Sequence, residues 1–150
     1  MVRKAVVDDV KKIHDIIELF AAKEAMLYRS ESDIYANIRD FFVYEKDGAI
    51  VGVGAMHMSC EGMGEIRSLA VRSKHVRKGI GRAIVQACLD EAALLGLKKV
   101  FALTYKAPFF HKLKFRTISK DVFPQKVWTD CVRCVKFPHC DEIAVIIELE

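Results

Sequence analysis

Residues 64–71 read Gly-Glu-Ile-Arg-Ser-Leu-Ala-Val, residues 72–78 read Arg-Ser-Lys-His-Val-Arg-Lys, and residues 79–85 read Gly-Ile-Gly-Arg-Ala-Ile-Val. In the first segment, polar and apolar side chains alternate before an apolar run at its end, which is typical of a strand. The last segment opens a helix. A basic loop containing glycine, placed between a strand and a helix N-terminus, is suited to binding an anion, because the backbone can approach closely and the first helical turn offers free N–H groups.

The glycine pattern excludes the two best-known nucleotide loops. No Gly-Lys-Ser/Thr follows, and Gly79-Ile80-Gly81 lacks the third glycine of a dinucleotide fingerprint. Arg77 and Lys78 add positive charge at the same place. An ordinary helix start with incidental basic residues is the alternative, but the strand before the glycines and the helix after them favour an anion site.

Working outward, the hydrophobic periodicity predicts alternating strands and helices. Helices are expected to begin near Asp8 or Asp9, after Ser30 or Ser32, and at Gly79, with a short one over residues 107–113. The second of these is expected to run to about residue 41, and Gly96 is expected to end the third as a C′ glycine. Strands are expected over residues 2–7, 41–45, 49–59, 64–71, 98–104, 115–119 and 142–148. The order predicts one α/β domain over residues 1–150 with a mixed sheet.

Composition narrows the class of protein. The chain has 150 residues, 52% of them hydrophobic and 29% charged, which fits a soluble globular domain. No apolar run is long enough to span a bilayer, and the N-terminus does not read as a signal peptide, so a cytoplasmic protein without membrane association is expected. The net charge of +4 suits an anionic ligand. The sequence has no run of lysines and arginines with interleaved aromatic residues, so a nucleic-acid partner is not expected. A homodimer is compatible with these features.

At Leu69-Ala70-Val71 and Gly79-Ile80-Gly81 the chain resembles the Gcn5-related N-acetyltransferases. One departure is that the family's Arg/Gln position falls on Val76, with Arg77 one place later. The resemblance implies a mixed, mostly antiparallel sheet flanked by helices, acetyl-CoA as co-substrate and no metal. It places the CoA site at Leu69, Ala70, Val71, Arg77, Lys78, Gly79, Ile80, Gly81, Arg82 and Phe110.

Acetyl transfer needs a neutral amine, so a base must take a proton from the acceptor. Glu65 is the candidate, because alternation along the strand predicts that alternate residues from Glu65 to Val71 share one face. The alternative is an ordinary exposed strand glutamate. The oxyanion needs preorganised N–H donors. The resemblance implies that a β-bulge in this strand frees the amide of Val71 for that purpose.

The departing thiolate has a less obvious partner. Many family members use a tyrosine on the helix matching residues 107–113, but Phe110 fills that position, and the usual glycine nearby reads Lys114. Thr104 and Tyr105, at the end of the preceding strand, are the candidate substitutes. Tyr105 can alternatively be a wall of the pocket.

Within the family the chain looks most like short N-acetylglutamate synthases. The resemblance rests on residues 27–31, 64–66, 101–104, 109–110 and 124–128. It implies acetylation of the α-amine of L-glutamate in arginine biosynthesis, with another amine, a peptide or a non-catalytic acetyl-CoA sensor as alternatives. Arginine binds carboxylates bidentately. The candidate acceptor residues are Arg29, Ser30, Arg67, Lys126 and Arg133, each with the alternative of a solvated surface residue.

The segment before the last strand contains Cys131, Cys134, His139 and Cys140. One Cys-x-x-Cys pair with two further ligands can bind zinc or an iron–sulfur cluster. Only one such pair exists, and adjacent ligands at 139 and 140 would be strained, so reduced thiols packed against the last strand are favoured. A structural metal or a redox-sensitive thiol pair is the alternative.

Overall fold

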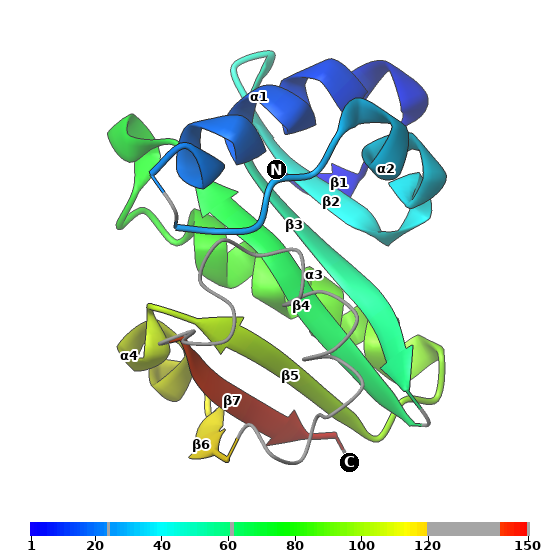
Figure 1. Cartoon of the computed structure of the whole chain (residues 1–150), viewed down its shortest axis with the longest axis vertical. Coiled ribbons are helices and arrows are strands. Elements are labelled where there is room, and N and C mark those ends of the chain that lie inside the picture. Colours follow the sequence, from blue (N-terminus) through cyan, green and yellow to red (C-terminus); the bar gives the residue numbers. More distant parts are fainter. Residues whose placement is uncertain (24, 61, 120–141, 150) are drawn as a thin grey trace.

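The structure is a computed structural model that describes residues 1–23, 25–60, 62–119 and 142–149. Within these residues the chain forms one seven-stranded sheet (Figure 1). Its strand order is β1-β2-β3-β4-β5-β7-β6, and β4 and β5 form the parallel pair within it, the others pairing antiparallel. The strands are β1 (Val2–Lys4), β2 (Phe41–Lys46), β3 (Ala49–Cys60), β4 (Met63–Val71), β5 (Lys99–Thr104), β6 (Arg116–Ile118) and β7 (Ile143–Glu148). The mixed, mostly antiparallel α/β fold is therefore confirmed.

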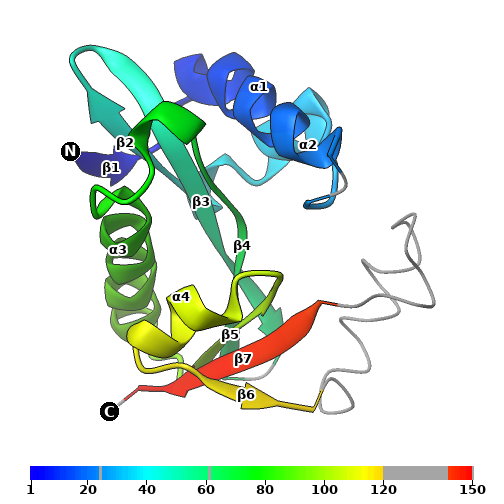
Figure 2. The same cartoon turned by 90° about the vertical axis from the view of Figure 1, so that its left-hand side faces the viewer.

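Helices cover both faces of the sheet (Figure 2). They are α1 (Val10–Ala21), α2 (Glu31–Ala36), α3 (Ile80–Leu94) and α4 (Ala107–Lys112), with short 3-10 turns η1 (Val7–Asp9), η2 (Ile38–Asp40) and η3 (Ser73–His75). Buried isoleucines of α1 pack with α2 on one face of β2, β3 and β4, while α3 and α4 pack on the opposite face. The two faces are called the α1 face and the α3 face below.

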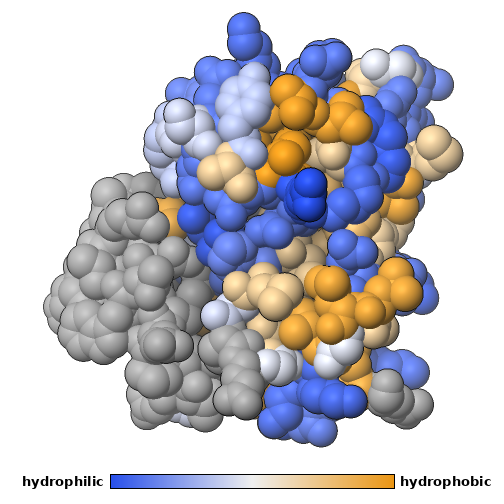
Figure 3. Space-filling model, turned by 90° about the vertical axis from the view of Figure 1, so that its right-hand side faces the viewer, coloured by the Kyte–Doolittle hydropathy of each residue, from blue (hydrophilic) through white to orange (hydrophobic). Residues whose placement is uncertain are grey.

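The surface drawn in Figure 3 carries hydrophobic side chains in two groups separated by hydrophilic residues. The exposed leucines Leu94 and Leu95 lie at the end of α3, where the chain turns back toward β5. Their exposure follows from the helix ending at the margin of the core. Within the described ranges, no helix combines the length and the hydrophobicity needed to cross a bilayer.

Several element boundaries differ from the sequence prediction. The first strand ends at Lys4 rather than residue 7, and the Asp9 carboxylate accepts a hydrogen bond from the amide of Val6 at 2.8 Å instead of capping α1. Helix α2 ends at Ala36, because Asn37 leaves helical geometry. The predicted extension of this helix to about residue 41 is therefore wrong, whereas the predicted start of a strand at Phe41 is confirmed. The predictions of a cap for α2 at Ser30 and a C′ glycine at residue 96 are confirmed.

A β-bulge interrupts β4 at Ser68. Val53 pairs with Ala70, but Ala55 pairs with Arg67, so β4 contains one extra residue between these pairs, and Ser68 has a φ of +57°. An extra residue reverses the side-chain alternation that follows it. The prediction that alternate residues from Glu65 to Val71 share one face is therefore wrong. Glu65 and Arg67 lie on the α1 face, whereas the later apolar residues Leu69 and Val71 pack against the core under α3.

Strands β4 and β5 meet at one end and diverge toward the other (Figure 1). Their ladder consists of residues 63–65 paired with residues 99–101, and Glu65 opposite Phe101 is its last pair. Beyond Glu65, the second half of β4 faces the opening between the strands. The bulge thus lies just past the point where the two strands part.

Candidate active site

The loop between β4 and α3 holds its backbone in left-handed geometry at two places. Arg77 has a φ of +63°, and Gly79, the N-cap residue of α3, has a φ of +81°. Glycine adopts this conformation without a steric penalty, whereas a side chain there is strained. The loop thereby turns sharply into the first turn of α3, whose N–H groups have no intrahelical partners. The order of strand, glycine-containing loop and helix N-terminus is the one that the sequence predicted.

Gly81 is small because an aromatic ring lies against it. A Cβ atom at this position would come within 3.2 Å of the ring of Phe109. Phe109 is partly buried at the start of α4, so α4 supports the first turn of α3. Phe109 was not among the predicted CoA residues, which included its neighbour Phe110. Adjacent helical residues point about 100° apart, and Phe109 is the one whose ring lies against Gly81.

Phe110 lies in the hydrophobic core. It is 4% exposed and makes edge contacts with Phe109 and Phe115, each with ring centroids 5.1 Å apart. Among the other predicted CoA residues, Arg77, Lys78 and Arg82 are exposed around the loop, and Ile80 is buried beneath it. Leu69 and Val71 are partly buried, and Ala70 points to the α1 face. The basic side chains are therefore available to an anion while the apolar ones build its support.

Glu65 is buried at the point where β4 and β5 part. Glu65 is 2% exposed, and its Oε1 atom lies 3.7 Å from Nη1 of Arg67. The side chain faces the α1 face, away from α3. The sequence alternative of an ordinary exposed strand glutamate does not hold, because the carboxylate is almost fully enclosed.

A pocket on the α1 face brings together two of the predicted acceptor residues. Arg29 is 7% exposed, and its Nη1 atom lies 3.4 Å from Oδ2 of Asp33. Arg67 reaches the same pocket from β4. The pocket is lined by Arg29, Asp33, Ile34, Asn37, Asp40, Phe41, Ala55 and Arg67. Two guanidinium groups and two carboxylates thus share one small polar site beside Glu65.

Ser30 has a structural partner. Its hydroxyl oxygen accepts a hydrogen bond from the amide of Asp33 at 3.1 Å, and this bond caps α2. Ser30 itself is exposed, next to the buried Arg29. The cap fixes the start of α2, which carries Asp33 into the pocket.

Thr104 and Tyr105 lie where β5 ends, as predicted. The hydroxyl oxygen of Thr104 accepts a hydrogen bond from the amide of Lys106 at 2.7 Å, and this contact shapes the turn into α4. Because the oxygen acts as acceptor, the hydroxyl proton can still be donated. Tyr105 is partly buried directly after it.

Two polar residues of this region were missed by the sequence analysis. Nδ1 of His57 on β3 lies 2.6 Å from Oδ2 of Asp40 in η2. Asp40 lines the pocket, and His57 is the cross-strand partner of Glu65. The two residues are 17 positions apart, and neither belongs to a motif. The one available signal was that His57 stands between two methionines of a predicted strand.

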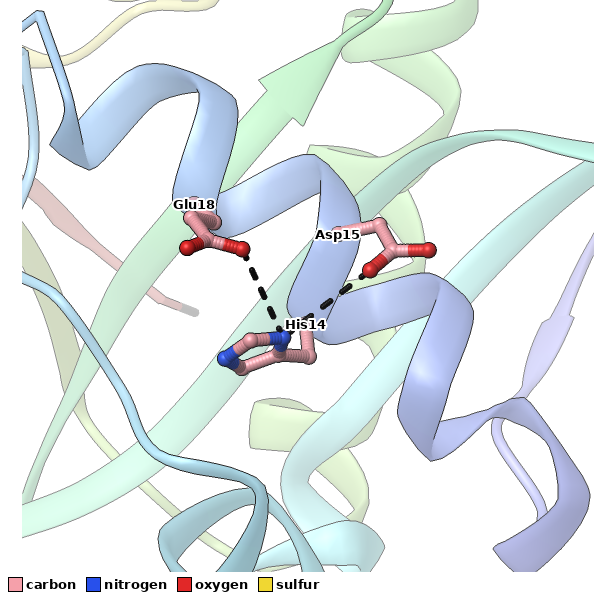
Figure 4. Close-up of side chains that lie close together, drawn as sticks. All are labelled: His14, Asp15 and Glu18. Atoms are coloured by element: carbon pink, nitrogen blue, oxygen red, sulfur yellow. Dashed lines mark ion pairs between the residues drawn. The ribbon is translucent and has the colours of Figure 1, made fainter.

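Among the described residues, one group has the geometry of a potential metal site (Figure 4). Nδ1 of His14 lies 3.9 Å from a carboxylate oxygen of Asp15 and 3.9 Å from one of Glu18. Both acidic residues are exposed on α1. This is a common surface arrangement, and nothing further points to a bound ion. The predicted candidates Lys126, Arg133, Cys131, Cys134 and Cys140 lie outside the described residues.

Comparison with known proteins gives a consistent result. The model of the acetyltransferase (GNAT) family matches residues 8–115. An uncharacterized N-acetyltransferase from Chlorobaculum tepidum is 40% identical, over 97% of this chain and 94% of its own length. An amino-acid acetyltransferase from Mycobacterium tuberculosis is 33% identical, over 89% of this chain and 78% of its own.

The fold agrees with the same assignment. A Mycobacterium tuberculosis protein solved in complex with CoA and a second ligand superposes with a TM-score of 0.84. That structure is 28% identical in sequence and covers 100% of this chain, which in turn covers 99% of the solved one. With the family model spanning most of the described sequence, the chain belongs to the acetyltransferase (GNAT) family.

Proposed function

We propose that this N-acetyltransferase transfers the acetyl group of acetyl-CoA to the α-amine of L-glutamate, the first step of arginine biosynthesis. One observation carries the proposal: Arg29 and Arg67 enter the same pocket while Glu65 lies beside Arg67. The name of the Mycobacterium tuberculosis relative, an amino-acid acetyltransferase, supports an amino acid as acceptor.

The two arginines match the two carboxylates of the acceptor. A guanidinium group binds a carboxylate through two parallel hydrogen bonds and stays charged even when buried. Arg29 is largely enclosed, so its interaction with an anion is less screened by solvent than that of a surface residue. Asp33 already pairs with Arg29, and a bound carboxylate would compete with it for the guanidinium group.

Glu65 would remove the proton from the acceptor ammonium. It sits at the end of the β4–β5 ladder, where the opening between the strands meets the α1 face. The amine then attacks the thioester carbonyl. We assign the backbone N–H of Val71, three residues past the bulge at Ser68 and beyond the end of the β4–β5 ladder, to the carbonyl oxygen.

The CoA phosphates would lie at the start of α3. The left-handed residues Arg77 and Gly79 orient the loop, and Arg77, Lys78 and Arg82 are exposed around it. On the leaving-group side, Phe110 has no proton to donate and is buried in the core. Tyr105 and the hydroxyl of Thr104 are the nearest candidates at the end of β5 for protonating the thiolate.

The proposal is tested with Arg29→Ala. Losing one partner of an enclosed charged contact costs about 2–5 kcal/mol, so the KM for glutamate should rise more than tenfold. The Kd of CoA, measured by calorimetry, should stay within about twofold. Arg116→Ala is the matched control, because Arg116 is an exposed arginine paired with Glu148 at 3.0 Å, on the distant strands β6 and β7. Equal losses for both ligands would indicate damage to the fold instead.

The acceptor itself is tested by incubating acetyl-CoA with each of the twenty amino acids, polyamines and short peptides, and measuring thiol release. Asp33 and Asp40 balance the charge of the two arginines, which favours glutamine as a second substrate beside glutamate. If both are inert and a cationic amine or a peptide is acetylated, the glutamate assignment is wrong. Absence of turnover with any amine, together with CoA binding, would favour a sensor.

A further inference from the structure

The hydrogen bond between His57 and Asp40 joins a strand to a 3-10 turn across the edge of the pocket. Its length, 2.6 Å, makes it the shortest of the described histidine contacts, and the side chains of His57 and Asp40 are 32% and 26% exposed. An ionised carboxylate can only accept, so Nδ1 of His57 carries the hydrogen. Nε2 is then the nitrogen with the free lone pair.

His57 lies directly beside Glu65. The two are cross-strand partners in the antiparallel β3–β4 ladder, where the Cβ atoms of such a pair are about 4.5–5.5 Å apart. Both point to the α1 face, since their neighbours Met56 and Ile66 belong to the core under α3. A buried carboxylate and a partly exposed imidazole are therefore adjacent.

The reaction releases a proton that must leave the site. An ammonium and a thioester give an amide, a thiol and one net proton: the N–H bond breaks, the C–N bond forms, the C–S bond breaks, and the sulfur takes one of two released protons. Glu65 is only 2% exposed, so its carboxylate has little direct access to bulk water. His57 is both next to it and in contact with solvent.

We propose that His57, oriented by Asp40, accepts the proton that Glu65 takes from the acceptor and passes it to solvent. The inference rests on the amine acetylation proposed above. Protonation makes the imidazole a cation that keeps its hydrogen bond to the carboxylate of Asp40. Arg67 on β4 and, across the pocket, Arg29 and Asp33 are the other charged groups that face this site. Losing the proton to water returns the pair to its starting state.

The decisive variant is His57→Asn. An asparagine amide can still donate a hydrogen bond to Asp40, but it cannot accept and release a proton. We expect kcat to fall about 10²-fold, the range typical of a proton-transfer group, with the KM of the acceptor and the Kd of CoA within about twofold. In His57→Ala, added imidazole should restore kcat at least tenfold, because it can occupy the vacated position.

The matched control is His111→Asn. His111 on α4 also makes one hydrogen bond, to the hydroxyl of Thr117 at 2.8 Å, but it lies outside the pocket. Its kcat should match the wild type. Thermal unfolding of each variant shows whether it is folded. If neither His57 variant folds, Asp40→Asn decides: a fall in kcat at constant KM supports the relay, and an unchanged kcat contradicts it.

Two results would overturn the relay. One is a folded His57→Asn variant that keeps more than a third of the wild-type kcat. The other is a folded His57→Ala variant whose lost activity imidazole does not restore. All rates are measured with whichever amine the wild-type protein acetylates, so a wrong choice of glutamate leaves the test intact. If the wild-type protein acetylates no amine, both the proposed function and the relay are wrong. If the wild-type protein is active and His57→Asn is equally active, only the relay is wrong.

Discussion

Lys114 takes, at the end of α4, the backbone position that Gly96 takes at the end of α3. Their φ angles are +75° and +80°. Each helix end closes with the same two hydrogen bonds of a Schellman motif. At the end of α4, the amide of Lys114 donates to the carbonyl of His111, and the amide of Phe115 donates to that of Phe110. At the end of α3, the amide of Gly96 donates to the carbonyl of Ala93, and the amide of Leu97 donates to that of Ala92.

This relationship predicts that Lys114→Gly stabilises the protein. A side chain in the left-handed region costs about 1–2 kcal/mol, and glycine avoids it while losing more backbone entropy on folding. We expect the free energy of unfolding to rise by about 1 kcal/mol in urea titrations. Gly96→Ala, the matched change in the opposite sense, should lower it by a similar amount. No gain in Lys114→Gly would mean that the lysine side chain makes a contact that offsets its strain.

Cys88 is predicted to be chemically silent in the folded protein. It is fully buried on α3 in the core, and burial raises the pKa of its thiol to about 12, because an apolar environment disfavours the thiolate. A thiol reagent at pH 8 should label Cys88 only after unfolding, as peptide mass spectrometry can show. Rapid labelling of this peptide under native conditions would contradict the buried placement.

The same thiol adds a pH dependence to stability. Its pKa is raised by folding, so the stability that it contributes is present below its ordinary value of 9.0 and is lost as the pH rises toward 12. Cys88→Ala removes this group. Between pH 9 and pH 11, the unfolding free energy of the wild type should therefore fall more than that of the Cys88→Ala variant.

The contact between Arg3 and Asp9 predicts an effect at acid pH. The Arg3 guanidinium donates to both carboxylate oxygens at 2.8 and 3.1 Å, and this lowers the pKa of Asp9 below its ordinary 3.8. A depressed pKa gives stability that is present above 3.8 and lost as the pH falls through the lowered value. Asp9→Asn should cost about 1–3 kcal/mol at pH 7 and progressively less below pH 4.

The control for this prediction is Asp90→Asn. Asp90 is exposed on α3 and accepts one hydrogen bond, from Gln86 at 2.9 Å. Its replacement should change the unfolding free energy by less than about 0.5 kcal/mol. A penalty for Asp9→Asn that stays constant from pH 7 to pH 2 would show that hydrogen bonding without charge accounts for its role.

The loop before α3 predicts how CoA affinity responds to added side chains. Gly79→Val places a β-branched residue at a φ of +81°, and Gly81→Leu drives a side chain into the ring of Phe109, 3.2 Å from the position of its Cβ. Calorimetry should detect no CoA binding by the double variant, while circular dichroism shows a folded protein. Gly48→Val is the control for strain alone, because Gly48 has a φ of +78° in the remote β2–β3 turn. CoA affinity unchanged in the double variant would exclude this loop as the phosphate site.

The sequence by itself predicted most of the helices and strands and the glycine loop before α3. The periodicity of α1 and α3, the cap at Ser30 and the terminal Gly96 are local properties, set by hydrogen bonds and side chains within a few residues of one another. For the same reason the loop at Gly79 could be predicted: a strand, a glycine at positive φ and a helix N-terminus are consecutive in the chain.

Only the tertiary structure decided which side chains meet. The bulge at Ser68 depends on how β4 pairs with β3, and one extra residue moves Leu69 and Val71 to the face opposite Glu65. The pairing of His57 with Asp40 likewise comes from a strand and a turn that no motif connects. Register and cross-strand contact arise from packing between distant segments, so the alternation of a single strand could place Glu65 on a face but could not identify its neighbours.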